Sequence, residues 1–165
     1  MTTAEAVAAA LERLMPADLV VGCRPIGPGD EAALLPEEAR ALPSTVATAR
    51  RASGTARSLA RDLLVRIGAP AVPILRTSSG APVWPPGFAG SLAHDEAFAV
   101  AVVARTTTAS AVGIDVEPAE PLPSDVADLV VHSEDRLGDA GDPLAARLAF
   151  VAKEAVYKAV HPLCG

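Results

Sequence analysis

The spacing of apolar positions along the chain predicts a mixture of helices and short strands. Some stretches repeat apolar residues at helical intervals, whereas shorter apolar runs are typical of buried strands. Helices are expected at residues 3–14, 48–67 and about 144–161, with a short one starting at Pro36, and strands at 18–23, 98–103 and 111–117. Residues 70–90 are rich in proline and glycine, which predicts an ordered loop. The last two strands are expected to pair as a hairpin.

The strand expected at Gly113–Glu117 brings two carboxylates together. Alternation with a period of two puts Ile114 and Val116 on one face and Asp115 and Glu117 on the other. Paired carboxylate oxygens suit a hard cation such as Mg²⁺, which keeps water and accepts substrate phosphates as further ligands. A solvated strand face is the alternative interpretation of so short a pattern.

The last predicted helix adds three charged residues. Its apolar positions form two stripes on nearly opposite sides, Leu144, Leu148, Val151 and Ala155 on one, and Ala149, Val156 and Val160 on the other. Glu154 and Lys158 lie beside the first stripe, and Lys153 lies beside the second. Every other basic residue of the chain is arginine, although lysine and arginine serve equally in a surface pair. Two interpretations of these lysines therefore stay open. The site needs an ammonium group that contacts a phosphate oxygen, or Glu154 and Lys158 form an ordinary ion pair on the helix surface.

Two weaker signals point to phosphate as well. His94 precedes the strand at 98–103, and the helix at 48–67 has one basic side, formed by Arg50, Arg51, Arg57, Arg61 and Arg66. Guanidinium groups bind phosphate bidentately, although a charged helix face is often only solvated. The sequence contains no Walker glycine loop, dinucleotide-binding fingerprint, kinase signature or Ser-His-Asp arrangement. The residues alone therefore indicate metal-assisted transfer that involves a polyphosphate.

The composition argues against some classes of binding partner and indicates the cellular compartment. The net charge of −6 argues against binding to nucleic acids or anionic membranes, so any phosphate site must be local. Cys23 and Cys164 give no disulfide framework, which fits a reducing cytoplasm. No secretory signal starts the sequence, and the apolar run at Ala97–Ala104 is too short to span a bilayer. A cytoplasmic protein is expected.

Several motifs follow one another in a specific order through most of the chain. They are Arg50-Arg51, Arg57, Arg61, Pro73–Arg76, Gly80–Pro85, Gly87, Gly90–His94, Gly113–Pro118 and Ala152–Ala159. In this order they resemble the Sfp/EntD-type 4′-phosphopantetheinyl transferases, especially the bacterial branch that serves siderophore and polyketide synthases.

The resemblance implies an α+β fold of two pseudo-symmetric lobes, each with a small antiparallel sheet and a helix, divided into residues 1–108 and 109–165. Coenzyme A would lie in the cleft between the lobes. Its 3′-phosphate is expected on Arg50 and Arg57, its adenosine near Arg76, and its other phosphate oxygens on His94, Lys153 and Lys158. Asp115, Glu117 and Glu154 would hold Mg²⁺, or Mn²⁺ in its place, against the pyrophosphate.

The implied reaction is attack by a serine hydroxyl of an apo acyl or peptidyl carrier protein on the β-phosphorus of coenzyme A, with release of 3′,5′-ADP. Glu154, Lys158 and His94 would be the catalytic residues. Glu154 is either a metal ligand or the base for the serine proton, because a carboxylate bound to a metal is a poorer base. A catalytically inactive fragment that binds coenzyme A or a carrier protein is one alternative, and a structural or regulatory metal-binding protein is another.

The chain departs from the family pattern in two places. Family members continue past the Lys-Glu-x-x-x-Lys helix, so the second lobe is expected to be incomplete at Gly165, with apolar surface and a sheet edge uncovered. A monomer is expected if the chain is complete. Asp95 follows His94 and would add negative charge near the phosphates. Residues 124–142, which have no clear pattern, fall where members of the family differ in how they recognise carrier proteins, so the sequence does not indicate which carrier protein is modified.

Overall fold

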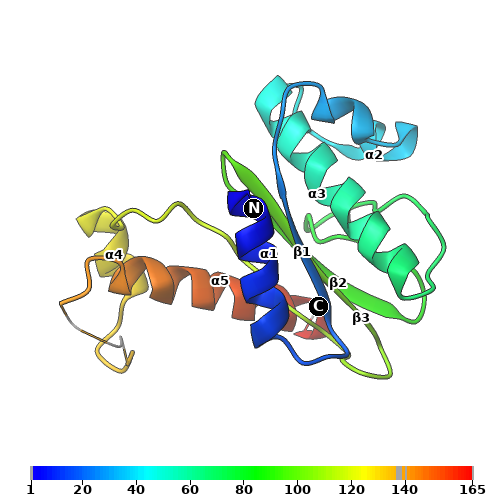
Figure 1. Ribbon diagram of the computed structural model, residues 1–165. Helices are drawn as coiled ribbons and strands as arrows, with labels where there is room; N and C mark the ends of the chain where they lie inside the picture. Colours follow the sequence, from blue (N-terminus) through cyan, green and yellow to red (C-terminus); the bar gives the residue numbers. More distant parts are fainter. Residues whose placement is uncertain (1, 137–138, 140, 165) are drawn as a thin grey trace.

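The computed structural model describes residues 2–136, 139 and 141–164, which form an α+β fold around one antiparallel sheet (Figure 1). The sheet has the order β1-β3-β2, with β1 at Val20–Pro25, β2 at Phe88–His94 and β3 at Phe98–Arg105. The helices are α1 (Thr3–Leu14), α2 (Pro36–Ala41), α3 (Ala47–Arg66), α4 (Ser124–Val130) and α5 (Ala145–Cys164), with a 3₁₀ turn, η1, at Asp30–Ala33. The α+β class and the four predicted helices are confirmed.

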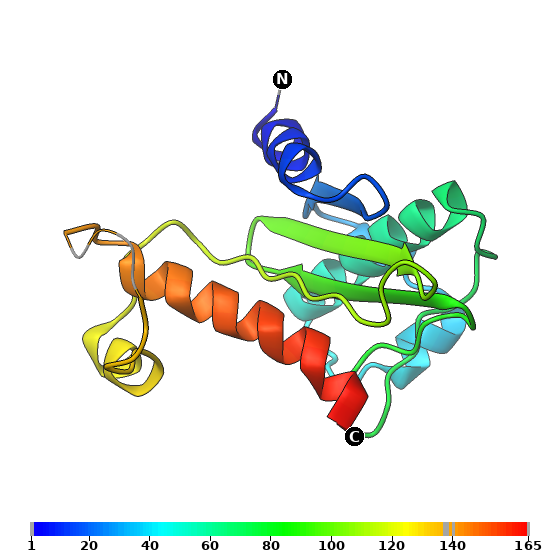
Figure 2. The same cartoon turned by 90° about the horizontal axis from the view of Figure 1, so that it is seen from below.

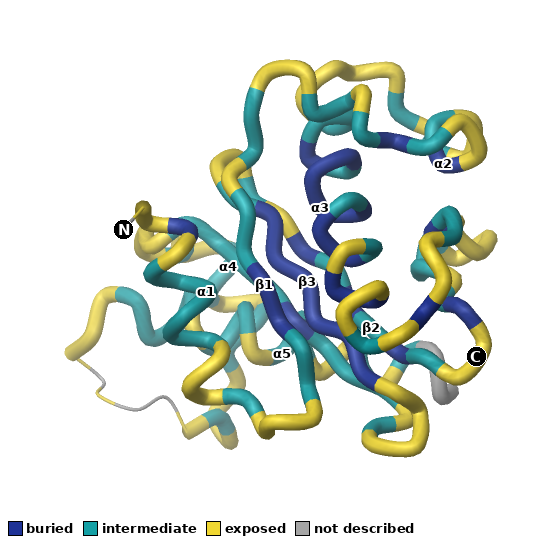
Figure 3. Tube along the Cα trace, turned by 45° about the vertical axis from the view of Figure 1, so that its right-hand side comes forward, coloured by how far each residue is buried: buried dark blue, intermediate teal, exposed yellow. Residues whose placement is uncertain are grey.

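The central strand β3 is buried on both faces. Ala101 and Val103 pack with Leu59, Leu63 and Leu64 of α3 on one side of the sheet. On the other side, Val100 and Val102 pack with Val21 and Ile114, and Leu11 of α1 covers them. Figure 3 shows the buried positions along β3 and the inner side of α3. Because each face of the strand meets apolar side chains, its sequence is apolar throughout, and the predicted buried strand is confirmed.

Helix α5 does not cover the sheet in the way that α3 does. Figure 2 shows α5 running along the side of the sheet, with α4 beyond its N-terminal end. Several apolar residues of α5 stay exposed, namely Leu148, Val156, Tyr157 and Val160. Val156 and Val160 of one predicted apolar stripe, and Leu148 of the other, are therefore exposed in the described structure.

The predicted hairpin between residues 98–103 and 111–117 is wrong. Strand β3 pairs with β2 on one side and β1 on the other, so neither of its edges is left for a returning strand. Residues 111–117 instead run as an extended segment outside the sheet. The actual hairpin joins β2 to β3, and β2 begins inside the stretch that was expected to be loop.

Asp95 closes this hairpin. Its Oδ1 accepts hydrogen bonds from the backbone N–H groups of Ala97 at 2.7 Å and Phe98 at 2.6 Å. A short polar side chain that binds the backbone two or three residues ahead is a usual way to stabilise a turn. The charge that was expected to act on the phosphates thus has a local structural role. Helix α4 was not expected, because the sequence around it lacks a clear pattern.

None of the helices in the described ranges is both long enough and apolar enough to cross a membrane.

Candidate active site

The acidic segment Ala111–Pro121 lies against α5, and one glycine makes this contact possible. A Cβ at Gly113 would stand 1.8 Å from the backbone oxygen of Ala155 and 3.1 Å from the backbone N of Ala159. Any side chain at this position would collide with the helix backbone. From the sheet side, Ser91 Oγ accepts a hydrogen bond from the N–H of Ile114 at 3.2 Å. The segment is therefore fixed between β2 and α5.

The alternation predicted for this segment is confirmed although the strand is not. Ile114 belongs to the buried cluster under α1, and Val112 and Val116 pack against the same cluster. Asp115 and Glu117 point the other way and contact residues of α5. An extended backbone gives this alternation without a strand partner.

Asp115 pairs with Lys158. The ammonium Nζ donates to Asp115 Oδ1 at 2.6 Å, and the carboxylate side chain is only 7% exposed. The other oxygen, Oδ2, is buried and has no hydrogen-bond partner among the described residues. Buried acceptors are normally satisfied, because an unpaired one costs about 1–3 kcal/mol. This oxygen is therefore suited to a ligand that the protein itself does not supply.

Glu117 pairs with Arg147 of α5. The Nη1 group of Arg147 donates to Glu117 Oε2 at 2.8 Å, and both side chains are largely shielded from solvent. Arg147 also donates from Nε to the backbone oxygen of Glu120 at 3.1 Å. One arginine thus holds both the carboxylate and the backbone that follows it.

The third predicted metal ligand, Glu154, is half-buried on α5 and makes no hydrogen bond or ion pair to another described residue. Within the described ranges, no three Asp, Glu, His or Cys side chains are grouped closely enough to hold a metal ion. Asp115 and Glu117 lie on one segment and face one helix, but Lys158 and Arg147 neutralise them. The predicted three-carboxylate site is thus not assembled in this arrangement, and it stays a prediction.

His94 is the last residue of β2 and precedes Asp95. The charges of Lys158 and Arg57 contribute to its electrostatic environment. Packing around the ring lowers the pKa of His94, although part of the residue remains open to solvent. The positive charges of Lys158 and Arg57 lower it further, against the opposing effect of Asp95. The lowered pKa favours the uncharged imidazole at neutral pH, a form that keeps one ring N–H to donate.

Lys153 lies apart from Lys158. Its Nζ donates to Asp135 Oδ2 at 2.5 Å and to the backbone oxygen of Val130 at 2.7 Å. These contacts tie α5 to α4 and to the residues after it. The two lysines that were predicted to share one phosphate site thus have separate partners here.

The arginines predicted to bind coenzyme A hold the backbone around α3. Arg50 donates to the oxygens of Ala39 and Ser44, each at 3.3 Å. Arg57 is buried, donates from Nε to Ile74 O at 3.1 Å, and its burial lowers the guanidinium pKa. Its Nη2 makes no hydrogen bond to another described residue. Arg76 is exposed and donates to Gly80 O at 3.2 Å.

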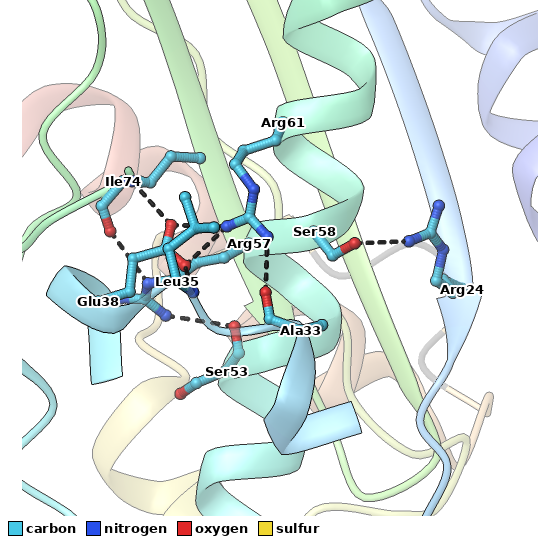
Figure 4. A network of polar contacts seen from close by, with 9 residues as sticks. All are labelled: Arg24, Ala33, Leu35, Glu38, Ser53, Arg57, Ser58, Arg61 and Ile74. Atoms are coloured by element: carbon cyan, nitrogen blue, oxygen red, sulfur yellow. Dashed lines mark hydrogen bonds and ion pairs between the residues drawn. The ribbon is translucent and has the colours of Figure 1, made fainter. Parts of the chain in front are cut away.

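A buried glutamate organises this region and escaped the sequence analysis. Both oxygens of Glu38 accept from Arg61, at 2.6 and 2.7 Å, and Glu38 Oε1 also accepts from the N–H of Ile74 at 2.8 Å (Figure 4). Glu38 Oε2 caps α2 through the N–H of Leu35 at 2.9 Å. Both residues are visible in the sequence, Glu38 in the first turn of the short helix and Arg61 in the basic helix. The sequence pattern does not show that the two side chains meet.

Two hollows each contain two of the predicted site residues. One, of about 790 Å³, is lined by His94, Glu117 and the N-terminal end of α3 near Arg51. The other, of about 260 Å³, is lined by Arg76, Ser91, Trp84 and Lys158. A larger groove of about 850 Å³ lies on the outer side of α5, where Lys153 and the exposed apolar residues line it.

Arg147 is the site residue that the sequence analysis missed. It lies seven positions before Glu154, and this spacing puts both residues on about the same side of a helix. That periodicity was the available signal, but only the folded chain shows that Glu117 is its partner.

Comparison with known proteins gives two adjacent matches. The sequence model described as 4′-phosphopantetheinyl transferase N-terminal domain matches residues 37–104. The model described as 4′-phosphopantetheinyl transferase superfamily matches residues 111–165. Together the two matches cover most of the chain, in the order in which the motifs occur.

Individual relatives agree with these matches. The 4′-phosphopantetheinyl transferase Svp of Streptomyces mobaraensis is 42% identical over 147 residues, and the match covers 84% of this chain and 59% of Svp. PptT of Mycobacterium tuberculosis is 41% identical over 133 residues, and the match covers 78% of this chain and 59% of PptT. Enterobactin synthase component D of Salmonella typhi is 37% identical over 84 residues, 47% of this chain and 34% of that protein.

This chain therefore spans about three fifths of the length of its first relatives, 59% in each case. Both parts of the sequence match models of one family, and the motif residues lie inside those matches. The chain belongs to the 4′-phosphopantetheinyl transferase family.

Proposed function

We propose that this chain transfers the 4′-phosphopantetheine group of coenzyme A to a serine of an apo acyl or peptidyl carrier protein, with Mg²⁺ as the metal. The observation that carries the proposal is Asp115. Its buried Oδ2 has no partner, its Oδ1 meets an ammonium group, and it lies within the part of the chain that matches the superfamily model. A half-satisfied carboxylate beside a lysine suits a site for a cation and a phosphate together.

The residues present fit a hard metal ion. Asp115, Glu117 and Glu154 would hold it through carboxylate oxygens, which Mg²⁺ prefers. When bound, Mg²⁺, or Mn²⁺ in its place, would neutralise charge on the pyrophosphate. Lys158 now pairs with Asp115, so the proposal includes a change of partner for this lysine when the pyrophosphate arrives, whereas Arg147 contacts only Oε2 of Glu117 and leaves Oε1 for the metal.

The basic residues are proposed to bind coenzyme A. Arg50 and Arg57 would hold the 3′-phosphate, and Arg76 would lie near the adenosine. The Nη2 group of Arg57, which is without a partner among the described residues, gives it a donor to offer. Lys158, Lys153 and a neutral His94 would donate to the other phosphate oxygens. Residues 1–108 and 109–165 would belong to the two lobes on either side of the bound coenzyme A.

In the reaction, the serine oxygen forms a bond to the β-phosphorus, and the bond from that phosphorus to the bridging oxygen breaks. The products are phosphopantetheinyl serine and 3′,5′-ADP, which carries away the electron pair of the broken bond. The serine proton passes to a base, directly or through water. Glu154 is proposed for this role or for the metal, because it makes no competing contact with another described residue.

The test is incubation of the full chain with an apo carrier protein, coenzyme A and Mg²⁺, followed by mass spectrometry of the carrier protein. The expected result is a mass gain of one phosphopantetheine group and formation of 3′,5′-ADP. A carrier protein with its acceptor serine changed to alanine is the control. An unmodified carrier protein under conditions in which a known family enzyme modifies it would contradict the proposal.

A second candidate is a catalytically inactive module that binds coenzyme A or a carrier protein. The carboxylates that pair with Lys158 and Arg147 in the free chain favour it. Retained coenzyme A binding without transfer would identify this function.

A further inference from the structure

Arg147 bridges two parts of the chain that are 30 residues apart in sequence. Its guanidinium contacts three acceptors at once, namely Glu117 Oε2 at 2.8 Å, Glu120 O at 3.1 Å and Pro121 O at 3.5 Å. All three belong to the segment that follows Asp115, while Arg147 itself stands in the first turn of α5. A fork of several N–H donors is what allows one side chain to hold a carboxylate and a neighbouring backbone together.

This contact differs from an ordinary surface ion pair. The Arg147 side chain is only 16% exposed, and that of Glu117 is 29% exposed. Exposed pairs contribute little because water competes for both charges, whereas shielded, charge-assisted hydrogen bonds fix geometry more firmly. In the same chain Arg40 and Glu37 form a looser pair at 3.7 Å, with both side chains more than half exposed.

The position of Arg147 along α5 relates it to the proposed site. Arg147, Glu154 and Lys158 follow one another at intervals of seven and four residues, so they share one side of the helix. The two cations flank Glu154, and each holds one carboxylate of the acidic segment. Gly113 sets the start of this segment against Ala155, and Arg147 sets its end. The segment is thereby held in one register along the helix.

We infer that Arg147 is a positioning residue of the proposed transferase site, which orients Glu117 and fixes residues 117–121 along α5, the helix that carries Glu154. This inference rests on the proposed function for its effect on catalysis. Arg147 acts through Glu117 and the backbone, and it needs no contact with coenzyme A or with the carrier protein.

The first measurement is calorimetric titration of Mg²⁺ into the full chain saturated with coenzyme A. Arg147→Gln is expected to weaken Mg²⁺ binding about tenfold or more, as loss of a group that orients a metal ligand usually does. Arg147→Lys keeps the charge but loses the fork, so partial recovery is expected. The exposed Arg13→Gln on α1 is the control for lost charge and is expected to match the wild type.

Steady-state kinetics give a second readout that a general loss of stability would not produce. For Arg147→Gln the apparent KM for Mg²⁺ is expected to rise about tenfold, while the KM for coenzyme A stays within about twofold. An equal rise in both constants, or wild-type Mg²⁺ affinity in Arg147→Gln, would overturn the inference.

Hydrogen exchange of the backbone amides separates this inference from the proposed function. In the chain without ligands, exchange of residues 114–121 is expected to quicken in Arg147→Gln and not in Arg13→Gln. Unchanged exchange refutes the positioning role, whatever reaction the wild-type chain performs. If the wild-type chain transfers nothing and the exchange difference is still present, the proposed function fails and the positioning role stands.

Discussion

The Nζ atom of Lys158 lies 2.6 Å from Oδ1 of Asp115, and Oδ2 of the same carboxylate is buried without a described partner. The lysine and the aspartate, which are predicted to contact a phosphate and a metal, therefore pair with each other in the free chain. Binding of a metal with a phosphate would replace one ion pair by two, since the cation takes the carboxylate and the phosphate takes the ammonium. The prediction for Asp115 follows from this exchange of partners.

Asp115→Asn is expected to lower transfer about a hundredfold or more, because it removes the negative charge that would attract the cation while it keeps the shape of the side chain. The fold should change little, since the amide oxygen still accepts from Lys158. Mass-spectrometric single-turnover rates and a thermal melt measure the two effects. Asp18→Asn, at an exposed position, is the matched control. Near-normal transfer by Asp115→Asn at limiting Mg²⁺ would rule out the metal role.

Glu154→Gln separates the two roles proposed for this residue. If Glu154 is a metal ligand, Mg²⁺ binding in the presence of coenzyme A should weaken about tenfold or more. If it is the base, Mg²⁺ binding should remain while kcat falls by about 10²–10⁴ and the acidic limb of the pH–rate profile disappears. Calorimetry and a pH–rate profile of the same variant decide between them. Wild-type values in both measurements would exclude Glu154 from the site.

Glu38→Gln is expected to destabilise the fold by about 3–5 kcal/mol, because it leaves Arg61 with a buried, uncompensated charge. The Glu38 side chain is 0% exposed and that of Arg61 is 12% exposed. Urea unfolding measures the loss. Glu37→Gln changes the neighbouring residue, whose pair with Arg40 is exposed, and should cost at most about 1 kcal/mol. Equal stability of the two variants would contradict the structural role of Glu38.

Gly113→Ala is expected to push the acidic segment away from α5, because the added Cβ would overlap the backbone oxygen of Ala155. The helix backbone cannot yield as a side chain would, so both stability and Mg²⁺ binding should fall. Gly27→Ala is the control, since its Cβ would meet only Asp30 Oδ2 at an ordinary 3.8 Å. A thermal melt and the Mg²⁺ titration compare the two variants. Wild-type stability and Mg²⁺ binding in Gly113→Ala would show that the close contact with α5 is unimportant.

His94 predicts a pH dependence of stability. Burial lowers its pKa in the folded chain, so the unfolded chain takes up the proton first as the pH falls. Its effect on stability is therefore absent well above the unfolded pKa of about 6.5, and stability is lost as the pH drops below that value. Urea unfolding between pH 8 and 5 should show a shallower decline in His94→Asn than in the wild type. Identical slopes would mean that His94 does not titrate abnormally.

The sequence predicted the helices well because their apolar periodicity and their proline or glycine boundaries are local properties. The mutual facing of Asp115 and Glu117 was also predictable, since any extended backbone alternates its side chains. The hairpin prediction failed because apolar runs do not say which strand pairs with which. Strand β1 lies far ahead in the sequence, and it occupies the edge of β3 that the prediction left free.

The contacts of the charged residues could not be predicted from the sequence for a similar reason. Arg57 reads as a solvated or phosphate-binding residue in a basic helix, yet the fold buries it against the oxygen of Ile74. Asp95 looked like a charge near the phosphates, and it closes a turn instead. The resemblance to the family selected the region of the site, but only the packed structure shows which charges already neutralise each other.

The bond between Ile114 and Ser91 is the one hydrogen bond that joins Ala111–Glu117 to the sheet within the described residues. A strand in a ladder shifts only when a row of hydrogen bonds breaks together, and it drags its neighbours along. A segment joined to the sheet by one hydroxyl group is free of that constraint. Its position therefore depends on α5, through Gly113, Lys158 and Arg147, so a movement of that helix would carry both carboxylates with it while the sheet stays unchanged.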